Sequence, residues 1–111
     1  MARPEAGSVV VVRFPFSDLS SAKRRPALVL AALERGDFIL CQITSNPFSD
    51  PRAVRLGEED FEVGGLPRVS FVRPGKIFTA NAEIVEGSVG RVGNGFRRRV
   101  VREVISLLAA E

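Results

Sequence analysis

Residues 25–45, RPALVLAALERGDFILCQITS, decide the fold. Two apolar runs within them, residues 27–32 and 38–44, are rich in the aliphatic and β-branched side chains that favour strands. Residues 34–37 (ERGD) separate the runs, and a short polar gap that contains glycine is typical of a β-hairpin. The stretch therefore predicts two antiparallel neighbouring strands, the first of which begins near Arg25.

The predicted hairpin places polar side chains together at one end of the sheet. Because the strands are antiparallel, Arg25 at the start of the first strand lies beside Thr44 and Ser45 at the end of the second. A guanidinium offers a planar fork of hydrogen-bond donors to phosphate oxygens, and a hydroxyl can bind the same oxygens. Such a pair suits chemistry on a phosphodiester, in which negative charge builds up on these oxygens.

Further short strands are expected on both sides of the hairpin. The β-branched and aromatic run at residues 8–16 predicts a strand that ends near Pro15. After a segment rich in strand breakers, we expect strands at residues 53–56, 69–72 and 76–79, an acidic turn or short helical piece at 58–60, a bend at 73–75, and turns with a short strand at 81–95.

The end of the chain changes to helical periodicity. Apolar residues recur at spacings of three and four from Phe96 to Leu108, and Asn94 is the expected N-cap. At 111 residues the chain has the size of one domain, so residues 1–111 are expected to share a single core. The pattern predicts a mostly β (α+β) fold, a compact barrel or curled sheet closed by one C-terminal helix.

Composition excludes several classes of function. The chain has no histidine, so it lacks the usual general base at neutral pH and the commonest metal ligand. Its one cysteine, Cys41, lies in a predicted strand and is expected to be buried in the core rather than to form a disulfide. No apolar run approaches the length of a membrane helix, and no secretory signal is evident, so we expect a soluble cytoplasmic protein without membrane contact.

Charge is distributed unevenly along the chain. Residues 1–30 carry five lysines and arginines against two acids, residues 31–66 three against seven, and residues 67–111 eight against four. If the fold brings the basic ends to one face, that face attracts a polyanion. An ordinary solvated surface accounts for the same charges equally well. The arginines at residues 97–102 are expected to form a solvated helix face.

Several sequence blocks together resemble the MazF/PemK-type toxins of toxin–antitoxin pairs. The resemblance begins with GSVV at residues 7–10, FPFSD at 14–18 and KRRPALVL at 23–30. It continues with QITS at 42–45 and with GGLP, SFVRP and KIFT between residues 64 and 79. No block is specific alone, but their order and spacing match the family over roughly residues 7–80.

The resemblance implies a fold, an activity and partners. The fold is a small SH3-like β-barrel with a C-terminal helix, assembled as a homodimer. The activity is that of an endoribonuclease without metal or other cofactor, which cuts single-stranded RNA such as mRNA at short sequences and leaves a 2′,3′-cyclic phosphate and a 5′-hydroxyl. The expected partner is a cognate antitoxin, and the complex with it is a candidate for binding operator DNA.

The resemblance also assigns roles to individual residues. Arg25 and Thr44, which the hairpin geometry brings together, match the family's catalytic pair, Arg25 stabilising charge or acting as acid and Thr44 hydrogen-bonding the phosphate. Residues expected to contact RNA are Ser20, Ser21, Lys23, Arg24, Gln42, Ser45 and Lys76. No carboxylate stands between Val69 and Lys76, where some family members have one, so the general base is left open.

Other interpretations of the same residues stay open. Arg25 could cap a sheet edge in an ion pair, and Thr44 could be an ordinary strand residue. A second hypothesis is a nucleic-acid-binding module that holds phosphates without cleaving them, including an autoregulatory complex on DNA. A third is an interaction protein built on a barrel, because fold alone does not fix function.

Overall fold

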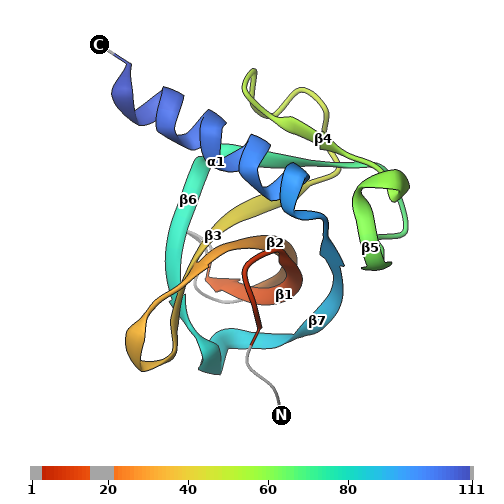
Figure 1. The fold of residues 1–111 in the computed structure, drawn as a ribbon. Coiled ribbons are helices and arrows are strands. Elements are labelled where there is room, and N and C mark those ends of the chain that lie inside the picture. Colours follow the sequence, from red (N-terminus) through yellow and green to blue (C-terminus); the bar gives the residue numbers. More distant parts are fainter. Residues whose placement is uncertain (1–3, 16–21, 111) are drawn as a thin grey trace.

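The computed structural model describes residues 4–15 and 22–110 (Figure 1). Within them the regular elements follow in the order β1 (Ser8–Pro15), β2 (Ala22–Ala32), β3 (Asp37–Thr44), β4 (Val54–Leu56), β5 (Phe61–Gly64), β6 (Ser70–Asn81), β7 (Val85–Val92) and α1 (Asn94–Ala109). Single 3-10 turns, one of them at the acidic Glu58–Asp60, join some of these elements. No helix of the described residues is long and apolar enough to cross a membrane.

The strands form one antiparallel sheet that curls on itself (Figure 1). The strand order is β4-β6-β3-β2-β1-β7-β5, so that β4 and β5 are its two edges. Helix α1 lies across one end of the curl and packs against β6 (Figure 1). The expected class is therefore confirmed: the fold is mostly β, a half-barrel of antiparallel strands with one C-terminal helix.

Apolar residues cover both faces of the central strands. One buried cluster joins the strands to α1 and includes Val9, Leu28, Cys41, Ile43, Leu56, Val72, Phe96, Val100 and Val104. A second cluster lies on the other face and includes Val10, Val12, Ala27, Val29, Phe38, Leu40 and Ala80. Burial on both faces explains why residues 9–12 are an unbroken run of valines rather than an alternation of apolar and polar residues. Cys41 is fully buried, as predicted.

The predicted β2–β3 hairpin is confirmed, and it sets the register around the site. Ala27 lies opposite Gln42 in an antiparallel pair. The turn contains Gly36 with a φ of 80°, a left-handed conformation that glycine adopts without a steric penalty. Strand β2 begins at Ala22 rather than near Arg25, because its first residues pair with β1.

The bend expected at residues 73–75 does not end a strand. Strand β6 continues from Ser70 to Asn81, and the register with β3 jumps so that residues 73–76 face Gln42 alone. This bulge accommodates Pro74 without a ladder hydrogen bond from its nitrogen. Two segments expected to be separate strands are therefore one bulged strand.

One further expectation near the C-terminus is wrong. Asn94 is not the N-cap: Gly93 occupies that position, and Asn94 Oδ1 instead accepts hydrogen bonds from the Arg97 guanidinium at 3.2 and 3.0 Å. The strand expected with turns at residues 81–95 is present as β7, which is eight residues long and pairs with both β1 and β5. Its glycines lie within a ladder supported on two sides.

Candidate functional site

A basic pocket of about 350 Å³ lies where the β2–β3 pairing ends. Its wall includes Arg24 and Arg25 from β2, Thr44 and Ser45 from the end of β3, and Arg68 from the segment before β6. Among the described residues, no carboxylate lines this pocket. In residues 4–15 and 22–110, no group of three Cys, Asp or Glu side chains could hold a metal ion. The pocket can attract an anion such as a phosphate.

Arg25 and Thr44 belong to one row of the sheet. The β2–β3 ladder ends with Ala27 opposite Gln42. If the same register is continued by two residues on each strand, Arg25 lies opposite Thr44. Directly opposed residues of antiparallel strands direct their side chains to the same face. Both residues are half-buried. The structure thus brings together the two side chains that the hairpin pattern predicted to meet.

The loop after β3 orients the Thr44 hydroxyl. Thr44 Oγ1 accepts a hydrogen bond from the backbone N–H of Asn46 at 3.1 Å, which leaves the hydroxyl proton available to another acceptor. Asn46 Oδ1 accepts from the N–H of Phe48 at 3.0 Å. The Arg73 guanidinium donates to the carbonyl of Ser49 at 3.2 Å and ties the loop to β6. These bonds make Thr44 a positioned hydrogen-bond donor.

A carboxylate that the sequence pattern missed lies next to the pocket. The Nε of Arg24 donates to both carboxylate oxygens of Glu86, on β7, at 2.7 and 2.8 Å. These residues are 62 positions apart, so no local motif links them. Glu86 therefore orients Arg24 at the rim of the pocket.

The other residues expected to bind RNA do not all meet there. Ser45 lines the pocket. Gln42 does not, and its Oε1 accepts a hydrogen bond from Arg73 at 3.4 Å. Lys76 is exposed on the bulge of β6 and also lies outside the lining. Ser20, Ser21 and the side chain of Lys23 fall outside the described residues.

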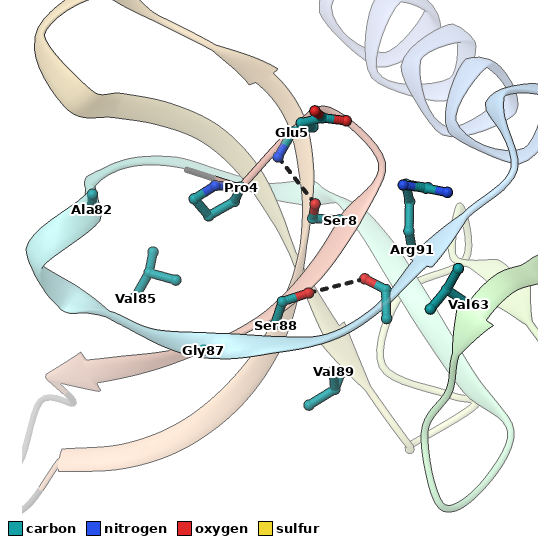
Figure 2. A pocket seen from close by; sticks show the side chains of 11 residues that line it. Pro4, Glu5, Ser8, Val63, Ala82, Val85, Gly87, Ser88, Val89 and Arg91 are labelled. Carbon is teal, nitrogen blue, oxygen red and sulfur yellow. Dashed lines mark hydrogen bonds between the residues drawn. The ribbon is translucent and has the colours of Figure 1, made fainter. Parts of the chain in front are cut away.

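A larger hollow of about 630 Å³ lies between the N-terminal segment and β7 (Figure 2). Its polar side chains are partly used within the protein: the hydroxyl of Ser88 donates to the carbonyl of Gly90 at 3.3 Å, and Arg91 pairs with Glu62 at 3.6 Å. Valines and backbone contribute much of the remaining wall. The smaller pocket at Arg25 is therefore the better candidate for binding an anion.

The fold and the pocket define a class of small curled-sheet proteins with a basic site at a strand end. A family model described as "PemK-like, MazF-like toxin of type II toxin-antitoxin system" matches residues 5–109. This match spans nearly the whole chain. The protein belongs to this family of toxins.

Solved structures share the fold. MazE–MazF from Deinococcus radiodurans has a TM-score of 0.79 and 22% sequence identity, with 100% of each chain covered. An endoribonuclease in complex with its cognate antitoxin from a mycobacterial species has a TM-score of 0.72 and 16% identity, covering 100% of this chain and 98% of that one. Mycobacterium tuberculosis toxin MazF-mt6 has a TM-score of 0.71 and 15% identity, covering 94% and 98%. No curated protein sequence gave a match.

Proposed function

We propose that this toxin is an endoribonuclease that cleaves single-stranded RNA, such as mRNA, at short sequences in the pocket at Arg25. The observation that carries the proposal is the shared row of Arg25 and Thr44, which line one pocket in a member of this toxin family. A mycobacterial protein of the same fold is named an endoribonuclease, which supports this activity.

The proposed reaction uses the substrate's own nucleophile. The 2′-hydroxyl attacks the adjacent phosphorus and loses its proton to solvent, while the bond from phosphorus to the 5′-oxygen breaks and that oxygen takes a proton from solvent. The products are a 2′,3′-cyclic phosphate and a 5′-hydroxyl. Arg25 donates to the phosphate oxygens and stabilises the negative charge that grows on them, and Thr44 donates its hydroxyl proton to the same group. Protein side chains alone supply this stabilisation, and the scheme needs no metal ion.

We further propose that the toxin is a cytoplasmic homodimer controlled by a cognate antitoxin. Two structures of similar fold are complexes: one is named MazE–MazF, and the other is named an endoribonuclease in complex with its cognate antitoxin. Phe48 and Leu108 are 92% and 71% exposed, so these side chains offer apolar surface to a partner chain. An antitoxin that covers the pocket at Arg25 would exclude RNA.

Incubation of the purified protein with a long single-stranded RNA in EDTA tests the ribonuclease activity. We expect discrete fragments that end in a 2′,3′-cyclic phosphate. Arg25→Ala should lower the cleavage rate roughly 100- to 1000-fold, the usual cost of removing one donor to a developing oxyanion. Arg98→Ala, which removes an exposed arginine on α1, is the matched control.

The same assay separates the competing functions. RNA that stays intact but remains bound would favour a nucleic-acid-binding module without cleavage. A protein that neither cleaves nor binds RNA would favour an interaction protein. Equal cleavage by Arg25→Ala and the wild type would remove Arg25 from the mechanism.

A further inference from the structure

A second basic hollow, the arginine cleft, lies between the edge strand β4 and helix α1. It has a volume of about 370 Å³ and is walled by Arg52 and Arg55 on one side and by Arg99, Arg102 and Glu103 on the other. Four arginines thus stand against one glutamate. A hollow with this excess of positive charge concentrates anions.

Two of these arginines are partly neutralised within the protein. Arg52 lies 3.8 Å from Glu103 and also donates to Ser106 at 3.3 Å, contacts that connect the loop before β4 to α1. Arg55 pairs with Glu59 at 2.6 Å, and both side chains of that pair are more than half exposed. Exposed pairs of this kind are weak, so Arg55 can exchange its partner for a stronger anion.

The two helix arginines keep their charge available. Arg102 is exposed, and its guanidinium makes no hydrogen bond or ion pair with the part of the chain that the structure describes. Arg99 is exposed as well, and its guanidinium carbon lies 5.6 Å from the centre of the Phe96 ring. Both line the cleft from the α1 side. The cleft therefore has unused donors.

The sheet connects this cleft to the pocket at Arg25. Phe71 of β6 lies opposite Thr44 on one side and opposite Arg55 on the other. The three side chains therefore belong to one row and one face of the sheet. Two strand spacings, about 10 Å, separate the backbone of Thr44 from that of Arg55. Phe71 is only partly buried, and an aromatic ring between two phosphate sites is typical of single-stranded RNA binding.

We propose that the arginine cleft binds a phosphate of the substrate RNA at a distance from the bond that is cut. The strand runs from the pocket over Phe71 and Arg55 and then around the edge strand β4 to Arg102, because α1 packs on the opposite face of the sheet. This inference rests on the ribonuclease function proposed above and extends its substrate site. An acidic protein segment could also bind arginines, but the aromatic residue between the two sites favours a chain of bases and phosphates.

The test measures RNA affinity at several salt concentrations in the Arg25→Ala background, which keeps the RNA intact. Arg102→Gln should weaken binding of a long single-stranded RNA roughly three- to tenfold. It should also reduce the slope of log affinity against log salt by about 0.7, the value for one phosphate contact on a single strand. Arg98→Gln, an equal change of charge at an exposed site of the same helix outside the cleft, is the control.

Several outcomes would overturn the inference. It fails when Arg102→Gln and Arg98→Gln lower the affinity and the salt slope equally, which would indicate general electrostatics. It also fails when Arg102→Gln leaves RNA binding unchanged and weakens binding of the antitoxin, which would make the cleft a protein site. Wild-type protein that binds RNA but leaves it intact overturns the ribonuclease proposal instead, and the salt slopes still decide the role of the cleft.

Discussion

The pocket at Arg25 and the arginine cleft are both basic, but different parts of the fold build them. The polar pair of the pocket comes from adjacent strands of one hairpin, and their register, continued two residues past Ala27 and Gln42, sets Arg25 opposite Thr44. The cleft joins an edge strand to a helix at the other end of the chain. Its geometry depends on how α1 packs through Phe96, Val100 and Val104.

Under the two proposals above, the difference separates a role in cleavage from a role in binding RNA. A site fixed by a hydrogen-bonded ladder holds its groups rigidly, as stabilisation of a transition state requires. A site between a helix and an edge strand can tolerate small shifts, which suffices to hold a phosphate and adds affinity. Changes in the pocket should therefore alter the rate of cleavage, and changes under the helix should alter binding.

After Arg25→Ala, Thr44→Val should give the largest effect, on the chemical step. The substitution keeps the branched shape and removes the hydroxyl that donates to the phosphate in the proposed mechanism. Hydrogen bonds to charged groups contribute roughly 1.5–3 kcal/mol, so single-turnover cleavage should slow about 10- to 100-fold. Binding of RNA should change much less, because the arginines around the pocket remain.

Thr44→Ser is the control for that substitution. Serine keeps the hydroxyl, which accepts from the N–H of Asn46 at 3.1 Å in the wild type and donates to the substrate in the proposed mechanism, so most of the activity should return. Urea unfolding of both variants separates a loss of loop structure from a loss of the donor. Comparable cleavage by Thr44→Val and the wild type would show that Thr44 is only a strand residue.

Val100→Ala should have an intermediate effect, on the cleft. Val100 is fully buried beneath α1, and loss of its two methyl groups should lower the free energy of unfolding by about 2 kcal/mol. A looser helix should weaken RNA binding and reduce its salt slope, while the cleavage rate at saturating RNA stays near that of the wild type. Arg98→Ala on the exposed side of α1 is the control. A lower rate at saturation with unchanged affinity would contradict the division of roles.

The same difference explains how much of each site the sequence could predict. Local features decide the hairpin: two apolar runs, a glycine turn and a strand length that sets Arg25 against Thr44. The contact between Arg24 and Glu86 and the arginine cleft depend on segments far apart in the chain. No local pattern records which distant strand or helix an arginine will meet, so sequence reasoning missed both.

The differences at the C-terminal end also have physical causes. Asn94 has the side chain of a good N-cap, but its oxygen binds Arg97 and the chain enters the helix from Gly93. Glycines in residues 85–92 suggested turns, because glycine is unfavourable in an isolated strand. Strand β7 forms because β1 and β5 pair with it on both sides. Tertiary pairing here overrides local propensity.

Ionisation of the Cys41 thiol should give the smallest effect. It changes the free energy of unfolding only at alkaline pH and not at neutral pH. Burial chiefly, with the negative charge of Asp50 second, raises the pKa of this thiol from 9.0 to about 12. The unfolded thiol ionises near pH 9 while the folded one keeps its proton, so this contribution to stability is complete below pH 9 and is lost as pH rises toward 12. Between pH 8 and 10 the free energy of unfolding should fall by about 1.4 kcal/mol more in the wild type than in Cys41→Ala.

The thiol also reports on the helix that closes the cleft. Cys41 belongs to the cluster that contains Val100 and Val104, so a thiol reagent reaches it only when the packing beneath α1 opens. At pH 8 the wild type should react slowly, and Val100→Ala should react faster in proportion to its lower stability. Bound RNA should slow the reaction in both proteins if it grips the cleft, because it then holds α1 against β4. If RNA still slows the reaction of the thiol in Arg102→Gln, the RNA blocks access to the core from the side of the pocket instead.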